Sequence, residues 1–281
     1  MVISVAALLV IGLNDSAFKF GEQVGVIEIR GIITDSKPCL TKLKKFRNNK
    51  NVKAIVLRID SPGGGVGPSQ EIYGEVKKTR GVKKVVASMG SIAASGGYYV
   101  ASAADHITAN PGTITGSIGV IMEFANLEEL FKKIGVSAFV LKSGEYKDVG
   151  FPFREMTPQE KELLQGFIDN VHHQFVTAVA EARGIPEEEI QAIADGRIMS
   201  GEEAQKLGLL DSLGNLEDAI AIAAELGGIK GEPSVLYAGD EKFSLLEDFF
   251  GISVREVLND IRSTAMGCGY LWVPLWGKGN G

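Results

Sequence analysis

Apolar residues recur along this chain with two different spacings, which separate predicted strands from predicted helices. Two runs rich in β-branched residues, Val24–Arg30 and Val52–Asp60, predict strands because polar or glycine-rich breaks bound each of them. Between them, Leu40, Leu43 and Phe46 recur at helical spacing. The first unit of the chain is therefore predicted to be strand, helix, strand.

The same alternation continues through the middle of the chain. It predicts, in order, a glycine-rich loop at 61–67, a helix at 68–80, a strand at 84–89, a helix at 95–104, and short strands at 106–109 and 137–141. Because strands and helices alternate, we expect an α/β fold with a substantially parallel sheet.

The last third of the chain is predicted to be a helical C-terminal extension. Thr157 to Glu160 form a capping-box pattern, and an apolar stripe continues from there to Gly184. Further helices are predicted at 186–194, from Ser200 onward, and at 216–226. No internal repeat is visible at a fixed period.

The N-terminal run Met1–Leu13 is apolar and uncharged. It is shorter than the roughly 20 apolar residues that a spanning helix needs, and it lacks the positive start of a signal peptide. We interpret residues 1–20 as a short or truncated membrane anchor. A buried strand or helix at the domain edge is the alternative.

Composition excludes several classes of protein. With 45% hydrophobic and 23% charged residues, the chain has the balance of a folded protein. Its net charge of -6 disfavours a nucleic-acid binder. Cys39 and Cys268 lie far apart, and neither belongs to a CxxC pair, so the sequence indicates no disulfide framework and no metal site.

Glycine is in excess, and it marks the expected site. The chain has 35 glycines among 281 residues, which exceeds the usual share of about 7%. Twelve of these glycines fall within residues 63–119. Two glycine-rich turns, at 60–65 and 89–97, follow predicted parallel strands, where ligands bind in α/β sheets. Bare backbone N–H groups there suit an oxyanion, although a tight turn without a ligand is the alternative.

Ser95 stands in the second turn, at the start of a predicted helix, where its hydroxyl is open to a substrate. The amides of Gly96 and Gly64 are the candidate oxyanion donors. The alternative is that Ser95 only caps its helix.

A nucleophilic serine needs a base, and the histidines are poorly placed for that role. His172 and His173 lie in the middle of a long predicted helix, and His106 lies on a short strand. Lysine can serve instead when burial lowers its pKa from about 10.4 towards 7 or 8. Lys147 is the candidate because it follows a predicted strand and a glycine turn.

Five motifs in order resemble the signal peptide peptidase A (SppA) family of serine proteases. They are DSPGGG at 60–65, MGSIAASGGYY at 89–99, TGSIGV at 115–120, SGEYKD at 143–148 and DGRIMSGEEAQKLGLLDSLG at 195–214. The resemblance implies a Clp protease/crotonase-like fold of repeated strand-strand-helix units. It assigns residues 21–228 to the protease domain and leaves the role of 229–281 open.

Carried over motif by motif, the resemblance implies a Ser-Lys dyad. Ser95 would be the nucleophile and Lys147 the general base, with Ser117 orienting the lysine and Gly64 and Gly96 donating to the oxyanion. It implies no cofactor and no metal.

The resemblance also implies partners and a location. Short family members form homo-octamers in which neighbouring subunits supply the serine and the lysine of one site. They are anchored at the N-terminus, with the protease domain outside the cytoplasm, and act on apolar residual signal peptides. A crotonase-like acyl-CoA enzyme and a non-enzymatic membrane scaffold are the alternatives from other functional classes.

Overall fold

Alternating strands and helices build one eight-stranded sheet with helices on both faces, in a computed structural model that describes residues 21–239 and 269–271. The strands of this described part are β1 (Gln23–Arg30), β2 (Val52–Ser61), β3 (Gly63–Gly65), β4 (Lys84–Ala93), β5 (His106–Ala109), β6 (Ile114–Gly116), β7 (Ile198–Ser200), β8 (Ser212–Leu213), β9 (Ser234–Tyr237) and β10 (Gly269–Leu271). Its helices are α2 (Lys37–Asn48), α3 (Val66–Arg80), α4 (Gly96–Ser102), α5 (Glu128–Lys133), α6 (Pro158–Arg183), α7 (Glu187–Ile193), α8 (Gly201–Lys206) and α9 (Leu216–Leu226).

The sheet is mostly parallel. Its strand order is β7-β6-β4-β2-β1-β9, with β5 beside β4 and β8 beside β5. The β1–β2, β2–β4, β4–β5 and β1–β9 pairs are parallel, whereas β6 and β7 are antiparallel. The predicted α/β class with a substantially parallel sheet is confirmed. The sheet also includes β9, from the region after residue 228 whose role the sequence left open.

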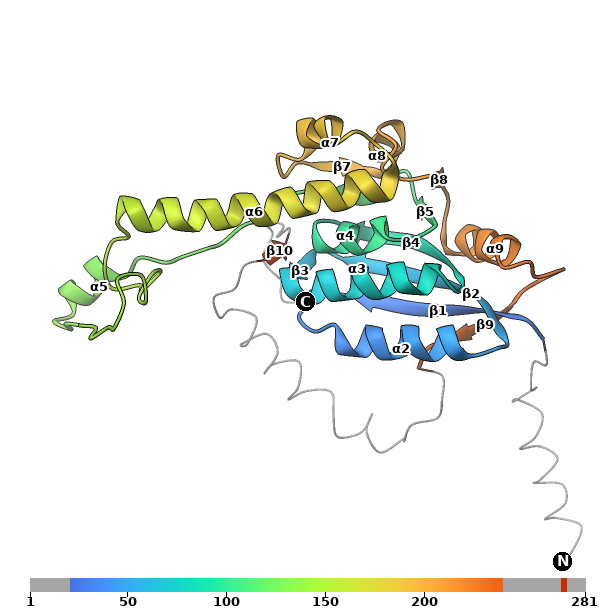
Figure 1. The fold of residues 1–281 in the computed structure, drawn as a ribbon, viewed down its shortest axis with the longest axis horizontal. Helices are drawn as coiled ribbons and strands as arrows, with labels where there is room; N and C mark the ends of the chain where they lie inside the picture. Colours follow the sequence, from blue (N-terminus) through green and yellow to red (C-terminus); the bar gives the residue numbers. More distant parts are fainter. Residues whose placement is uncertain (1–20, 240–268, 272–281) are drawn as a thin grey trace, which may run out of the picture.

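Strand alternation explains why helices cover both faces (Figure 1). Val24 and Val26 of β1 pack in one apolar cluster with α9. Ile27 and Ile29 belong to the larger cluster on the opposite face, which includes residues of α2, α3 and α4. Because successive side chains of a strand point to opposite faces, a strand buried on both sides needs apolar residues at nearly every position.

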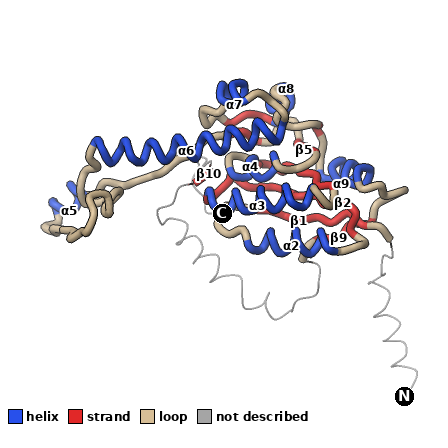
Figure 2. Tube along the Cα trace, viewed as in Figure 1, coloured by secondary structure: helices blue, strands red, loops and turns tan. Residues whose placement is uncertain are grey.

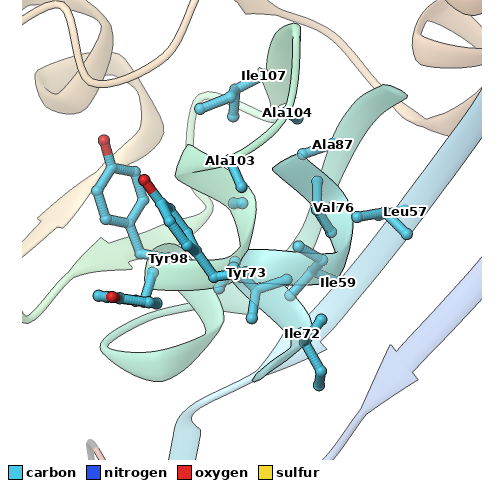
Figure 3. Packing of buried hydrophobic residues seen from close by; sticks show 14 of the residues in the cluster. Leu57, Ile59, Ile72, Tyr73, Val76, Ala87, Tyr98, Ala103, Ala104 and Ile107 are labelled. Atoms are coloured by element: carbon cyan, nitrogen blue, oxygen red, sulfur yellow. The ribbon is translucent and has the colours of Figure 1, made fainter. Parts of the chain in front are cut away.

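The larger core is centred on α3 and α4. Figure 3 shows Ile72 and Val76 of α3 gathered with Leu57 and Ile59 of β2 in this cluster. Tyr98 of α4 is fully buried, and its hydroxyl donates to the carbonyl of Leu209 over 2.8 Å. This packing fixes α4, and with it the turn that precedes the helix.

Most predicted elements are present within a few residues. The capping box at Thr157 opens α6, which ends at Gly184 with a left-handed φ of 65°. The helix predicted at 216–226 is α9. In the loop predicted at 61–67, Gly63–Gly65 form the short strand β3, and α3 begins at Val66, before the predicted Pro68.

The strand predicted at 137–141 is wrong. Residues 136–142 contain neither helix nor strand, and Phe139 and Leu141 are 85% and 92% exposed. A strand needs a partner for its backbone N–H and C=O groups. This segment lies away from the main sheet (Figure 2) and has no such partner within the described residues.

The segment belongs to an arm, defined here as residues 121–170, which projects from the sheet and its helices. Figure 1 shows the chain leaving the body after β6, forming α5 at the far end and returning along α6. Only the later part of α6, from Val171 on, carries buried apolar residues. The rest of the chain's described residues are called the body below.

The N-terminal segment 1–20 lies outside the described residues, so its interpretation as an anchor stays a prediction. Among the residues that the structure describes, no helix is both long enough and apolar enough to cross a bilayer.

Candidate active site

Three turns of the body meet beside the end of β4. The Ala94 N–H donates to the Ser61 carbonyl over 3.1 Å, which joins the turn after β2 to the turn after β4. The Ser95 N–H donates to the Gly116 carbonyl over 2.9 Å and so brings in the end of β6. The two glycine-rich turns predicted to form the site therefore lie together, and a third turn lies beside them.

Ser95 occupies a backbone conformation that side-chain-bearing residues rarely adopt. Its φ is 53° and its ψ is −119°. Such a position costs free energy, and it persists only where the surroundings hold it. Here the Gly116 carbonyl accepts from Ser95 N–H, and the Ser95 carbonyl accepts from Tyr99 N–H over 2.8 Å.

The hydroxyl of Ser95 makes no capping hydrogen bond to α4. The alternative that Ser95 only caps its helix is therefore wrong. Ser95 is 1% exposed, so within one chain its hydroxyl is covered and is not open to a substrate as the sequence predicted.

Gly64 has to be glycine, because a Cβ there would lie 2.2 Å from the Ile33 carbonyl oxygen. The Ile33 N–H donates to the Gly63 carbonyl over 2.8 Å, and Gly65 N–H donates to the Ile33 carbonyl over 2.9 Å. Since successive N–H groups of a strand point in opposite directions, Gly64 N–H faces the other edge of β3. That orientation suits an oxyanion donor.

Gly96 and Gly97 seat the start of α4 against the first turn. Gly96 is the first residue of α4, so no earlier carbonyl of this helix can accept its N–H. A Cβ on Gly97 would lie 2.8 Å from the Ser61 carbonyl oxygen. Close approach of backbone segments therefore explains why positions 64 and 97 are glycine.

Ser117 lies beside Ser95, because its neighbour Gly116 accepts from the Ser95 N–H. Ser117 has a left-handed φ of 51° and donates its N–H to the Arg197 carbonyl over 2.7 Å. The structure thus brings together the turns that carry Ser95, Ser117 and Gly96, and α4 contacts β3, which carries Gly64.

Lys147 is not part of this group within one chain. It belongs to the loop between α5 and α6, and Figure 1 shows this loop at the far end of the arm, away from α4. Lys147 is exposed, and its N–H donates to the Gly144 carbonyl over 3.2 Å. No hydrogen bond among the described residues joins its side chain to Ser95 or Ser117.

The histidines have other contacts. His106 Nε2 lies 2.9 Å from the Ser212 hydroxyl, and His173 Nδ1 lies 3.3 Å from a carboxylate oxygen of Glu187. The buried Nε2 of His172 has no hydrogen-bond partner in the described part of the chain. None of the three bonds to Ser95 there. Among all the residues that the structure describes, there is no cluster of three or more His, Cys, Asp or Glu that could hold a metal ion.

Three further residues, none of them predicted as site residues, shape the serine turn. Thr115 donates its hydroxyl to the Ala93 carbonyl over 2.8 Å, and an Asp60 carboxylate oxygen accepts from Ile92 N–H over 3.1 Å. Arg197 holds Ser117 through its backbone carbonyl. Asp60, Thr115 and Arg197 all stand inside the motifs quoted above, so their position in a motif was the available signal.

Comparison with known proteins gives a consistent result. Residues 77–230 match the model of Peptidase family S49. "Putative protease slr0021" of Synechocystis sp. is 47% identical over 209 residues, covering 74% of this chain and 76% of the relative. "Putative protease MJ0651" of Methanocaldococcus jannaschii is 36% identical over 250 residues, covering 88% and 80%. "Serine protease SPPA, chloroplastic" of Arabidopsis thaliana is 36% identical over 206 residues, covering 73% and 30%.

The described residues form a mostly parallel α/β sheet with a buried serine where glycine-rich turns meet. The family match and the relatives identify the class as serine protease. The chain belongs to peptidase family S49. The resemblance to SppA proteases is thereby confirmed, and both alternatives from other functional classes, the acyl-CoA enzyme and the non-enzymatic scaffold, give way to an enzyme that acts on peptide bonds.

Proposed function

We propose that this protease cuts apolar peptides, including residual signal peptides, with Ser95 as nucleophile and Lys147 of a neighbouring copy as general base. The observation that carries the proposal is the division of the predicted site within one chain. The turns of Ser95 and Ser117 are joined in the body, whereas the loop of Lys147 is at the far end of the arm.

In this mechanism the neutral Lys147 amine takes the proton of the Ser95 hydroxyl, and the oxygen attacks the peptide carbonyl. The N–H groups of Gly64 and Gly96 stabilise the oxyanion that forms. Lys147 then protonates the leaving amine, and water hydrolyses the acyl-enzyme. Ser117, beside Ser95, would orient the lysine when the neighbouring arm brings it in. No step needs a metal or a cofactor.

Exposed apolar residues on the arm support assembly into an oligomer. Phe139, Leu141, Ile134 and Leu130 are each at least 53% exposed, and Leu163 and Phe167 on the outer part of α6 are 50% exposed. Large apolar side chains left exposed on a projecting arm favour an interface there. We propose that the arm packs on a second copy and that the assembly is a homo-octamer, as the resemblance to short members of the SppA family implies.

A strand of this chain indicates how an extended peptide would bind. β10 pairs antiparallel with β3, with Tyr270 opposite Gly64 and Leu271 opposite Gly63. Added strands give affinity through main-chain hydrogen bonds that are largely independent of sequence. We propose that a substrate peptide adds to β3 in the same way, which places a carbonyl of its backbone at the Gly64 N–H.

The N-terminal segment 1–20 is proposed as a membrane anchor, with the protease domain outside the cytoplasm. The support is the apolar, uncharged run Met1–Leu13. Such a location suits substrates that are themselves apolar segments left in a bilayer.

Co-expression of two inactive variants tests the shared site. Ser95→Ala and Lys147→Ala should each lower kcat by about 10²–10⁴-fold. Made together with different tags, they should recover up to about a quarter of wild-type activity, because one site in four receives both intact residues.

The matched control pairs Ser95→Ala with the double variant Ser95→Ala/Lys147→Ala, which cannot complement it. If the first pair is no more active than this control although both chains co-purify, serine and lysine come from one chain and the shared site is refuted. If Lys147→Ala alone keeps its activity, lysine is not the base.

A further inference from the structure

We infer that Arg154 is a positioning residue for the catalytic lysine, because it ties the turn that carries Lys147 to the first turn of α6. The inference rests on the proposed role of Lys147. It concerns residues outside the serine turn, in a part of the arm that none of the steps above uses.

Asp148, the residue after Lys147, is the anchor of this turn. Its side chain is only 8% exposed. One carboxylate oxygen accepts from Lys142 Nζ over 2.6 Å, and the other accepts from Arg154 Nε over 2.9 Å. Arg154 also donates from Nη2 to the Asp148 carbonyl over 3.3 Å. The main chain beside Lys147 is therefore held by both the side chain and the backbone of Asp148.

The same guanidinium reaches α6. Arg154 Nη1 donates to a Glu160 carboxylate oxygen over 2.8 Å, and Nη2 donates to the other oxygen. Glu160, whose side chain is 5% exposed, also accepts from Thr157 N–H over 2.8 Å in the capping box of α6. Arg154 thus connects the lysine turn to the longest helix of the described residues.

The electrostatics of this cluster favour the ionised forms. Hydrogen bonds from Arg154, and then from Lys142, lower the pKa of Asp148 well below its usual range. Hydrogen bonds from Arg154 and from the Thr157 backbone lower the pKa of Glu160 to about 2. Two cations thus face two carboxylates, and the cluster is ionised and balanced at neutral pH.

The geometry needs an arginine. A guanidinium offers five N–H donors in a planar fork and can serve two carboxylates at once, whereas a lysine ammonium is a point charge on a flexible stem. By contrast, Lys147 itself is exposed, and in the described part of the chain its side chain has no hydrogen bond that would fix it. Its position in the assembly therefore depends on the turn beneath it.

The consequence is a specific kinetic signature. The peptide-binding edge β3 lies in the body, so loosening the lysine turn should leave KM unchanged. Proton transfer depends on where Lys147 stands, and a displacement of about 1 Å at a catalytic group can cost about 10²-fold in rate. A residue acting through Lys147 should therefore change kcat alone.

The experiment measures kcat and KM of the full-length assembled protein on an apolar peptide ester. Arg154→Ala should lower kcat by about 10- to 10²-fold with KM within about twofold of wild type. Arg154→Lys should recover part of the loss, and Asp148→Asn should lower kcat in the same way. Lys132→Ala is the matched control, because Lys132 pairs with Glu128 and Glu129 on the same arm without touching this cluster. It should remain within about twofold of wild type.

Two results would overturn the inference. One is an Arg154→Ala enzyme with wild-type kcat while Lys147→Ala is inactive. The other is loss of assembly by size-exclusion chromatography in both Arg154→Ala and Asp148→Asn, since that would make the cluster a structural support only. Activity that survives Lys147→Ala refutes the proposed base itself, and the inference about Arg154 falls with it.

Discussion

The two parts of the proposed site are built by different physical means. The serine turn of the body is buried, carries a left-handed φ at Ser95 and Ser117, and is held by backbone contacts too close for any residue but glycine at Gly64. The lysine loop of the arm is exposed and is held by an ionic cluster around Arg154. The serine part of the proposed site is thus held together within one chain. The arm, by contrast, carries Lys147, which stays exposed within its own chain.

In the proposed assembly, this contrast would account for the apolar side chains that the arm leaves uncovered. Within the arm, Phe131, Phe151 and Phe153 pack edge to face, with ring centroids 4.3 and 5.0 Å apart, and give it a small core of its own. Phe139 and Leu141 are not covered by that core and are 85% and 92% exposed. A second copy would cover these side chains and bring Lys147 to Ser95 in the same step.

The largest effect is expected when exposed apolar residues of the arm are replaced. Phe139→Asp together with Leu141→Asp should dissociate the assembly, because buried carboxylates at an interface lack partners. Activity should fall by about 10²–10⁴-fold, as it would without the base. Light scattering with size-exclusion chromatography measures the mass. Val82→Asp, at a residue 66% exposed on the body, is the control. An active, dissociated double variant would show that one chain suffices.

The next largest effect is expected from a substitution at Gly64, in the body. Gly64→Ala should lower kcat by about 10²-fold, because the added Cβ would meet the Ile33 carbonyl and displace one oxyanion donor. Gly67→Ala is the matched control, since nothing lies within 4 Å of a Cβ there and alanine favours the helix α3. Steady-state kinetics and thermal unfolding measure both variants. Unchanged kcat in a folded Gly64→Ala protein would remove Gly64 from the oxyanion site.

A smaller effect is expected at the edge of β3. Deleting residues 269–281 removes β10 from that edge, so a peptide no longer competes with the chain's own segment. We expect KM for an extended apolar peptide to fall about three- to tenfold with kcat unchanged, as relief from an internal competitor predicts. Adding the deleted segment back as a free peptide should raise KM again. An unchanged KM would mean that substrates do not use this edge.

The smallest expected effect concerns the thermal stability of the fold at acidic pH. Since the pKa of Glu160 is lowered to about 2 in the folded arm, its ion pair stabilises the fold above the ordinary pKa near 4.5. That contribution is lost as pH falls from 4.5 towards 2. Glu160→Gln should therefore narrow the difference in Tm between neutral pH and about pH 3, by a few degrees at most. Glu129→Gln, at an exposed carboxylate on α5, should leave this difference in Tm unchanged. Equal acid sensitivity in wild type and Glu160→Gln would count against this role of the cluster.

Much of the fold could be predicted because the signals were local. The capping box at Thr157 and the helical repeat behind it set the start and end of α6 within a residue. The runs that became β1 and β2 are apolar throughout because helices cover both faces of the sheet. The error at 137–141 has the same origin. That run has the composition of a strand, but composition carries no information on whether a partner strand lies within reach.

The sequence by itself determined which candidate catalytic groups are present: a serine before a helix, glycines without side chains beside it, a lysine in a glycine turn, and histidines placed elsewhere. Tertiary structure alone decided which of these groups meet. It joined Ser95 to Gly116, set the Gly64 N–H towards the edge that β10 occupies, and carried Lys147 away on the arm. Residue type and spacing specify local conformation, whereas the meeting of distant turns depends on how the whole sheet and its helices pack.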